Sequence, residues 1–290
     1  MHMPPALVLS YGPSGSGKTT DNLYSFPNGL YIASRGALLP AYHVCGYTPD
    51  SVEAATIDEA TKKLQEATKS GKYDAVIVDD FSFLAEQTIA NYEKRYSGFK
   101  MWGALRESTL GFRNAARKAN CHVILNCWQK APQTKPDGSF VRGGPLLSGK
   151  LPEQMPAMCD LVLQCSQDPM RKPWSGVYKC EHSTRYVMKD RFNICYNMSP
   201  APMNLAEILR AAGFDISRHK SLPWQEEVVE QFSQQLDAAG HALYDTANTL
   251  FGQLVNAKID PKAARWTMRD SLDRAVIRRA LQSNNTRFIA

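Results

Sequence analysis

One eight-residue segment near the start of the chain constrains the fold more than any other feature. Residues 12–19, Gly-Pro-Ser-Gly-Ser-Gly-Lys-Thr, fit the pattern G-x4-G-K-[ST] in full. An apolar run at residues 6–11 precedes them, which predicts a buried strand, a glycine-rich loop and a helix in succession. Loops of this kind wrap their backbone N–H groups around phosphates. The motif therefore predicts a phosphate-binding site at a strand-to-helix turn.

Each position of this segment has a chemical task. Glycines let the backbone curl around phosphates, a lysine reaches the β and γ oxygens, and a hydroxyl group binds Mg²⁺. Lys18 is the expected catalytic lysine and Thr19 the expected metal ligand. The expected nucleotide-binding residues are Gly12, Pro13, Ser14, Gly15, Ser16, Gly17, Lys18, Thr19 and Thr20. The predicted cofactors are ATP and Mg²⁺.

A second strand supplies acidic groups. Residues 73–80 are apolar almost throughout and end in Asp79 and Asp80, as is typical of a strand buried on both faces. Asp79 is expected to emerge beside the phosphate loop, as a catalytic carboxylate that holds the metal through water. Asp80 and Glu86 are both candidates to position the attacking water. Either could instead be a helix N-terminal acid that complements the helix dipole.

Strands and helices alternate along the first two-thirds of the chain. Strand-like runs at 29–34, 73–80, 122–127 and 160–165 flank helical patterns at 58–70, 84–95 and 103–119. This order predicts an α/β fold with a mostly parallel central sheet. Residues 129–150 form a long Pro- and Gly-rich loop, of a length that is usually functional. Runs at 176–181 and 184–196 are expected to pair as an antiparallel hairpin at a sheet edge.

The sequence predicts three parts: a core at residues 1–200, a connector at 201–223 and a C-terminal helical region at 224–290. A chain of 290 residues is long enough for one large core with an appendage. Hydrophobic residues make up 43% and charged residues 21%, which excludes a disordered or fibrous chain. No apolar run approaches the roughly 20 residues that span a bilayer, and the sequence has no signal-peptide pattern and no CxxC pair. We therefore expect a cytoplasmic protein without a membrane partner.

Positive charge is unevenly distributed. Residues 91–120 hold seven basic and two acidic residues, interleaved with aromatic ones, and residues 258–290 hold eight basic and three acidic ones. Cations with aromatic rings suit phosphate neutralisation and base stacking, although an amphipathic helix pair with aromatic residues in its core explains the first stretch equally well. The second stretch could bind DNA or pack on a neighbouring subunit. The expected DNA-binding residues are Lys94, Arg95, Lys100, Trp102, Arg106, Lys130, Lys135, Arg142 and Lys150.

The chain resembles the RecA-like ATPases that bacteriophages encode as single-strand annealing or recombination proteins. Beyond the nucleotide motifs, the resemblance rests on residues 123–126, 144–151 and 186–191, and it covers roughly residues 5–196. It implies a RecA-like P-loop NTPase core that assembles into a ring or filament. It also implies a DNA-stimulated ATPase whose partners are single-stranded DNA and a phage or host single-strand binding protein.

The resemblance also assigns individual roles. Lys189 and Arg191 match a basic-x-basic pair that reaches the ATP of the neighbouring subunit in the RecA family, where a cation would stabilise charge on the transferred phosphate. Alternatively, Lys189 and Arg191 are two residues apart on an edge strand and simply share its exposed face. Asn126, near the γ-phosphate, is a candidate nucleotide sensor or simply a cap on its strand end.

One departure from the family bears on turnover. RecA-type enzymes carry a catalytic glutamate at the end of the second strand, whereas residues 31–35 contain no carboxylate. Hydrolysis is then expected to be slow or to use another acid. The sequence favours an ATPase that acts on single-stranded DNA in phage recombination, annealing or replication. The alternatives are a nucleotide kinase, a packaging or remodelling motor, and an oligomeric scaffold that hydrolyses little ATP.

Overall fold

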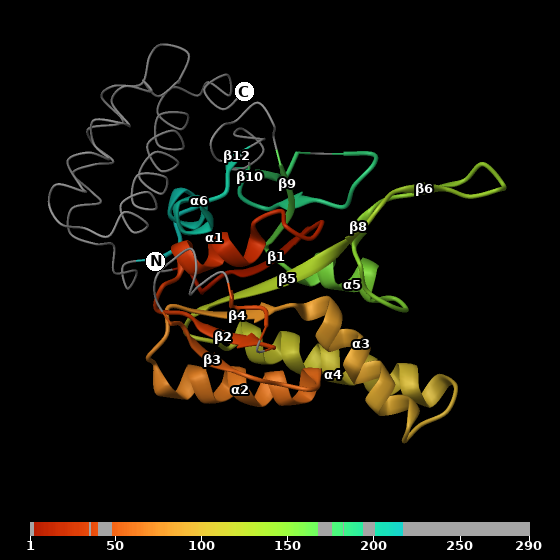
Figure 1. Cartoon of the computed structure of the whole chain (residues 1–290), viewed down its shortest axis with the longest axis horizontal. Coiled ribbons are helices and arrows are strands. Elements are labelled where there is room, and N and C mark those ends of the chain that lie inside the picture. The colour runs from red at the N-terminus through yellow and green to blue at the C-terminus, as the bar shows by residue number, and fades with distance from the viewer. Residues whose placement is uncertain are drawn as a thin grey trace, which may run out of the picture.

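A central β-sheet with helices on both faces organises the chain (Figure 1). The computed structural model describes residues 3–34, 36–39, 48–167, 176–181, 183–193 and 201–216. The strands of the sheet are β1 (Leu7–Gly12), β2 (Leu30–Ala33), β3 (Asp50–Val52), β4 (Ala75–Asp79), β5 (His122–Lys130), β8 (Gly144–Pro145), β9 (Leu161–Gln167), β10 (Gly176–Lys179), β11 (Lys189–Asp190) and β12 (Ala201–Pro202). Their main order is β12-β10-β9-β1-β5-β4-β2-β3.

The six strands from β9 to β3 in this order all run parallel. Every residue of β1 and β4 is buried, because helices cover both faces of the sheet. The α/β fold with a mostly parallel sheet is therefore confirmed. The parallel arrangement also places the carboxyl ends of β1, β4 and β5 at one edge, where polar side chains can converge.

The helices form two layers. Their bounds are α1 (Lys18–Ser25), α2 (Ile57–Ser70), α3 (Phe81–Glu93), α4 (Phe99–Arg117), α5 (Leu151–Met158) and α6 (Leu205–Ala211). Apolar residues of α1 and α6 bury one face of the sheet, and those of α2, α3, α4 and α5 bury the other. The helix predicted at 58–70 begins one residue earlier because Thr56 caps it, accepting a hydrogen bond from the Glu59 N–H at 3.2 Å.

Two predictions about the far edge of the sheet were wrong. The runs predicted to pair with each other as a hairpin instead both pair with β9, β10 along its second half and β11 along its first two residues. The core also continues past the predicted boundary at residue 200, because β12 pairs with β10 and α6 packs on α1. Leu205, Ile208 and Leu209 of α6 are fully buried. Residues 217–223 and the predicted helical region at 224–290 lie outside the described residues.

The segment predicted as a long loop has regular structure. β5 continues to Lys130, a separate hairpin follows as β6 (Gln133–Thr134) and β7 (Phe140–Val141), and β8 returns to pair with the end of β5. Figure 1 shows this hairpin, which we call the β6–β7 arm, projecting away from the body of the molecule. None of the helices in the described ranges has the length and apolar content needed to cross a membrane.

Candidate nucleotide-binding site

The phosphate loop between β1 and α1 requires glycine for two different reasons. At Gly12 the backbone lies against β9, so that a Cβ there would be 2.5 Å from the carbonyl oxygen of Cys165. Gly15 and Gly17 have φ angles of 76° and 95°, a region that side chains other than glycine's rarely tolerate. The loop is thus shaped by its glycines into a concave backbone surface.

Lys18 is folded over this surface. Its Nζ donates hydrogen bonds to the carbonyl oxygens of Gly12 and Pro13, each at 3.0 Å, and to Ser16 Oγ at 3.2 Å. The side chain is buried although it is charged. An ammonium group held in this way by neutral acceptors is positioned to meet an anionic ligand.

Thr19, in the first turn of α1, meets Asp79, at the carboxyl end of β4. The Thr19 hydroxyl donates to Asp79 Oδ2 at 2.6 Å. Burial raises the pKa of Asp79, and the hydrogen bond from Thr19 opposes that shift. A hydroxyl beside a desolvated carboxylate is an oxygen donor set that suits Mg²⁺, and a divalent cation would offset the cost of ionising Asp79. The residues present therefore fit a magnesium ion.

Asn126 is fixed in one orientation beside this pair. Its Oδ1 accepts hydrogen bonds from Ser10 Oγ at 2.6 Å and from Asn22 Nδ2 at 3.0 Å. The Nδ2 group therefore faces Asp79, whose pKa it lowers as a nearby donor, although it makes no hydrogen bond of ordinary geometry with any of the described residues. β5 continues four residues beyond Asn126, so the alternative that Asn126 caps a strand end is wrong. A buried amide donor is left available beside the metal-binding carboxylate.

Asp80 begins α3. Its Oδ1 accepts a hydrogen bond from the Phe83 N–H at 2.9 Å, so it is the helix N-terminal cap. Burial raises the pKa of Asp80 to about 6, and the Asp79 charge adds to this shift while the hydrogen bond from Phe83 opposes it. A carboxylate with a pKa near neutral suits a general base. Asp80 therefore caps α3 and also lies in the site beside Asp79, so the two roles expected for it do not exclude each other.

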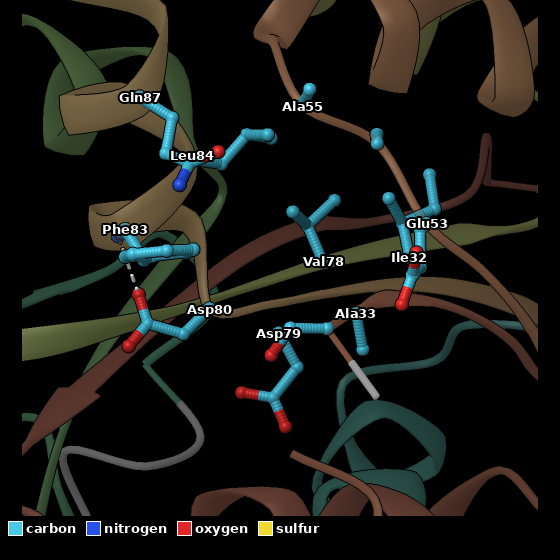
Figure 2. A pocket seen from close by; sticks show the side chains of 12 residues that line it. Ile32, Ala33, Glu53, Ala55, Val78, Asp79, Asp80, Phe83, Leu84 and Gln87 are labelled. Carbon is cyan, nitrogen blue, oxygen red and sulfur yellow. Dashed lines mark hydrogen bonds between the residues drawn. The ribbon is translucent and has the colours of Figure 1, made fainter. Parts of the chain in front are cut away.

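A pocket of about 230 Å³ opens beside Asp79 and Asp80 (Figure 2). Glu53, which follows β3, lines the opposite side, and the β2 end contributes Ala33 and Ser34 without a carboxylate. Glu86 is exposed on α3 and is not among the lining residues, whereas its neighbour Gln87 is. Sequence reasoning missed Glu53 because β3 has three residues, exposed or half-buried, with no apolar signal.

A second pocket of about 380 Å³ borders residues 13–16 of the phosphate loop. Two glutamines that sequence reasoning also missed line it from β9. Gln164 donates to Gln129 Oε1 at 3.2 Å, and Gln167 donates to the Gly15 carbonyl at 3.1 Å. The pocket thus presents amide groups that touch both the phosphate loop and the end of β5.

The phosphate loop is also linked to the base of the β6–β7 arm. The Tyr11 hydroxyl, one residue before the loop, donates to the Val187 carbonyl at 2.8 Å. Val187 in turn donates its N–H to Gly143 at the arm's base. Arg142 donates to the carbonyl oxygens of Ser183 and Tyr186. Arg142, predicted to bind DNA, therefore has a structural task at this junction.

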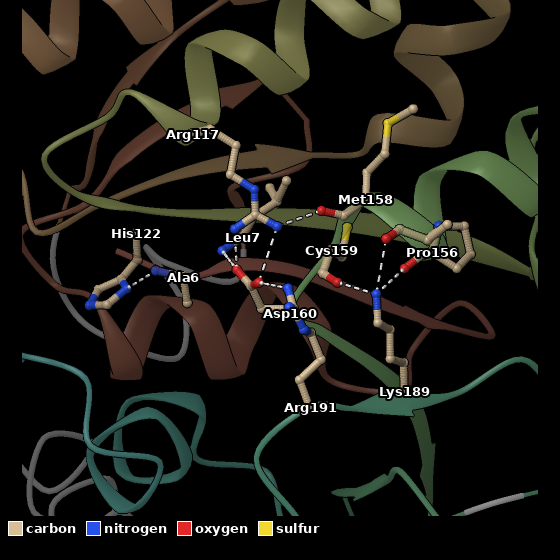
Figure 3. Close-up of polar contacts among 11 residues, drawn as sticks. Ala6, Leu7, Arg117, His122, Pro156, Met158, Cys159, Asp160, Lys189 and Arg191 are labelled. Carbon is tan, nitrogen blue, oxygen red and sulfur yellow. Dashed lines mark hydrogen bonds and ion pairs between the residues drawn. The ribbon is translucent and has the colours of Figure 1, made fainter. Parts of the chain in front are cut away.

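Lys189 and Arg191 bind groups of their own chain (Figure 3). Lys189 Nζ donates to the carbonyls of Ala157 and Cys159 at 2.9 and 2.7 Å, at the C-terminal end of α5, where a cation is favoured. Arg191 pairs with Asp160 at 3.1 Å. Both lie beside the start of β9, at the end of the sheet opposite the phosphate loop. A role in a neighbouring subunit's site stays a prediction.

The basic and aromatic residues of the segments predicted to bind DNA differ in how exposed their side chains are. Tyr92 and Phe112 are core residues, whereas Tyr96, Phe99 and Trp102 are exposed. The exposed predicted cations are Lys94, Arg95, Lys100, Arg106, Lys135 and Lys150, and Lys130 is half-buried. A Cβ at Gly149 would lie 2.5 Å from the Trp102 ring. The start of α4 and the end of the arm region, far apart in sequence, are therefore in contact.

Comparison with known proteins places the chain in a family. The sequence profile described as an AAA domain matches residues 5–192, well over half of the chain. The chain belongs to this AAA domain family. With the phosphate loop described above, membership makes it a P-loop NTPase, with the α/β fold and mostly parallel sheet that the sequence predicted. Membership of this family does not show whether the chain belongs to the phage annealing group that the resemblance implies.

Two solved structures are among those similar to this chain. A KaiC-like protein from the hyperthermophilic archaeon Pyrococcus horikoshii OT3 has a TM-score of 0.40 and 15% identity, covering 65% of this chain and 84% of that one. The RadB recombinase has a TM-score of 0.37 and 20% identity, covering 63% and 84%. No curated protein matches the sequence.

Replacing Asp80 with asparagine is expected to stabilise the protein at pH 8 and to reduce ATP turnover. Asparagine keeps the cap on α3 but removes a carboxylate whose pKa of about 6 exceeds its ordinary value of 3.8. Above about pH 6 the folded protein holds this group ionised against its surroundings. A gain of about 1–2 kcal/mol should therefore develop between about pH 4 and 6 and vanish below that range.

Urea unfolding of the nucleotide-free protein at pH 4 and pH 8 measures this difference. Asp137→Asn, at an exposed site where hydrogen bonds from Ser139 lower the pKa of the carboxyl, is the matched control and should give no gain at pH 8. Equal stability of wild type and Asp80→Asn at both pH values would contradict the prediction.

Proposed function

We propose that this protein hydrolyses ATP with Mg²⁺ and acts on single-stranded DNA in phage recombination, annealing or replication, assembled as a ring or filament. The observation that carries the proposal is a basic and aromatic surface on α4 and the β6–β7 arm, whose base is joined through Val187 to the strand that ends in the phosphate loop. The nucleotide chemistry rests on Lys18, Thr19 and Asp79, and the DNA role on that surface.

In the proposed hydrolysis, Mg²⁺ bound at Thr19 and Asp79 would neutralise charge on the β- and γ-phosphates. Lys18 places its ammonium group at the same phosphates, and the concave loop supplies backbone N–H groups. Asp80, with a pKa of about 6, is the carboxylate best suited to accept a proton from the attacking water. Asn126 Nδ2 would donate to whatever oxygen lies beside Asp79, which makes it sensitive to the state of the nucleotide.

The surface of α4 supports nucleic acid as the partner. Between residues 94 and 106 there are four basic residues and no acidic one. Phe99, Trp102 and Arg106 follow each other at spacings of three and four, so they share one exposed face of the helix. Phe99 is 95% exposed, an unusual position for a large apolar ring unless it meets a partner. Cations that alternate with exposed rings suit a single strand, whose bases are free to stack.

The contacts at the arm's base provide a route between DNA and ATP. The arm is joined through Gly143 and Val187 to Tyr11, the residue before the phosphate loop. A strand bound on the arm would therefore act on Gly12 through a short chain of hydrogen bonds. This arrangement favours a DNA-responsive ATPase over an oligomeric scaffold.

A nucleotide kinase is the less favoured function. Its acceptor would have to bind next to the γ-phosphate, where the 230 Å³ pocket is lined by Glu53, Asp79 and Asp80. Three carboxyl groups would repel a phosphorylated acceptor. Arg142, a candidate for a kinase lid, is held instead by the carbonyl oxygens of Ser183 and Tyr186.

The test measures ATP turnover without DNA, with a single-stranded oligonucleotide and with a duplex. Stimulation by the single strand alone is expected. A packaging or remodelling motor would respond to the duplex or to a protein, and a kinase or scaffold to neither. Turnover unchanged by single-stranded DNA, together with no retardation of the oligonucleotide at low salt with ATP, would overturn the proposal.

The double variant Lys100→Ala/Lys135→Ala is expected to weaken binding to all oligonucleotide sequences alike. Because each lost phosphate contact reduces counterion release, the slope of log K against log salt should fall in magnitude by about 1.4. Lys62→Ala/Lys69→Ala, at two exposed positions of α2, is the matched control and should leave the slope unchanged. Fluorescence anisotropy over a salt series measures both, and an equal loss of slope in the two double variants would contradict the prediction.

A further inference from the structure

Two aromatic side chains at the nucleotide end of the sheet have no role in the site described above. Phe83, in the first turn of α3, is 41% exposed, and Trp128, near the end of β5, is 37% exposed. Their ring centroids are 6.5 Å apart and the ring planes are tilted by 49°. Neither was expected to bind DNA from the sequence. Large rings at an exposed position beside an active site indicate a ligand rather than a core.

The aromatic pair is attached directly to the residues that surround the metal site. Phe83 donates its N–H to Asp80, as Figure 2 shows, and it lines the same 230 Å³ pocket as Asp79. The backbone N–H of Trp128 donates to the hydroxyl oxygen of Ser82 at 3.0 Å. Ser82 and Phe83 are two and three residues after Asp80. Both aromatic residues are therefore joined by a backbone hydrogen bond to the segment that starts with Asp80, Phe83 to Asp80 itself and Trp128 to Ser82.

We propose that Phe83 and Trp128 form a stacking platform for the bases of single-stranded DNA, and that base binding there adjusts Asp80 and so the rate of ATP hydrolysis. The inference rests on the proposed function and adds to it the element that recognises bases rather than phosphates. Stacking of bases on aromatic side chains tolerates any sequence, because every base has a π-face.

The cation and amide groups next to Trp128 favour a nucleic acid over an apolar protein segment, because the carboxyl groups of the adjoining pocket would repel only a phosphate placed inside that pocket. Lys130 is two residues after Trp128 on β5, so both side chains project from the same face of that strand. Polar side chains stand among the neighbours of the rings, since Asp80 and Gln87 are part of the lining of the adjoining pocket and Gln129 follows Trp128. Two rings with polar neighbours are too small a patch for a hydrophobic protein interface. A duplex does not fit either, because its bases are already stacked on each other.

The test compares a thymidine oligonucleotide with an abasic oligonucleotide of equal length, using the full chain with ATP. Phe83→Ala and Trp128→Ala are each expected to weaken binding of the thymidine strand by about 5- to 150-fold. Binding of the abasic strand, which offers phosphates alone, should change less than about twofold. Trp128→Phe should restore most of the affinity because it keeps a ring at this position.

Tyr73→Ala is the matched control, since Tyr73 precedes β4 at the opposite end of the sheet, and it should bind both strands like the wild type. At saturating thymidine strand, the ratio of DNA-stimulated to unstimulated turnover should fall toward one in Trp128→Ala and stay high in Trp128→Phe. Thermal unfolding monitored by circular dichroism establishes that each variant is folded.

The outcomes separate this inference from the function on which it rests. If the wild type binds neither strand, the DNA function itself is wrong. If it binds both strands and the alanine variants lose neither, DNA binding stands and the stacking platform is wrong. If the variants lose both strands equally, the rings support the fold or the charge surface, and the platform is again overturned.

Discussion

Lys18→Ala is expected to lower ATP turnover by about 10²- to 10³-fold or more, the largest loss of activity that we expect from a single change in this chain. The ammonium group lies over the concave loop, within 3.2 Å of three acceptors on it. Alanine removes the cation that would meet the phosphate oxygens and leaves the backbone cradle in place. The loss should therefore appear in catalysis and in affinity for the nucleotide, with little change in the fold.

Steady-state turnover and nucleotide titration measure both effects. Lys63→Ala, which removes a cation from a surface pair with Glu66 on α2, is the matched control and should keep full turnover. Lys18→Arg is also expected to fail, since a larger planar guanidinium does not match the three acceptors that hold the compact ammonium group. A Lys18→Ala protein that retains more than about a tenth of wild-type turnover would show that hydrolysis occurs elsewhere.

The parts of the site that the sequence predicted are those with strong local signals. The phosphate loop has a fixed spacing, and Asp79 ends an unbroken apolar run, so the residue pattern alone is enough to place both at the carboxyl edge of a parallel sheet. The structure brings Lys18, Thr19, Asp79 and Asn126 to that edge. Glu53 was missed because it follows a strand too short to have a period.

The errors occurred where strand pairing depends on distant packing. β11 and β12 contain two residues each, and no periodicity can be read from two residues. Which strand each of them pairs with depends on the open edges of β9 and β10. These edges exist only once the sheet has assembled. In the same way, the sequence suggested exposed roles for Arg142 and Lys189, whose acceptors are backbone carbonyls that no sequence pattern reveals.

Asp160→Ala is expected to lower the free energy of unfolding at pH 7 by about 3–5 kcal/mol, the largest loss of stability that we expect from a single change. Asp160 is 6% exposed and precedes β9. Its Oδ2 accepts from the Leu7 N–H at 3.0 Å and from Arg117 at 2.6 Å, and its Oδ1 accepts from Arg117 and Arg191, each at 3.1 Å. Removing the carboxylate leaves the Arg117 cation and a buried N–H without this acceptor.

The pH dependence provides a second signature. Burial alone would raise the pKa of Asp160, but the hydrogen bonds from Arg117 and Leu7 and the charges of Arg117 and Arg191 lower it below its ordinary value of 3.8. A lowered pKa means that the stabilisation is complete above about pH 4 and is lost as the carboxylate is protonated in stronger acid. The difference between wild type and Asp160→Ala should therefore shrink as the pH falls below about 4.

Urea unfolding at several pH values tests this, with Asp50→Ala as the matched control. Asp50 also pairs with a cation, Lys72, but both side chains are more than half exposed, so its loss should cost less than about 1 kcal/mol. Asp160 joins the starts of β1 and β9 to the end of α4, whereas Asp50 joins surface groups that water can replace. A loss in Asp160→Ala no larger than in Asp50→Ala would mean that sheet packing, not this ion-pair network, holds these elements together.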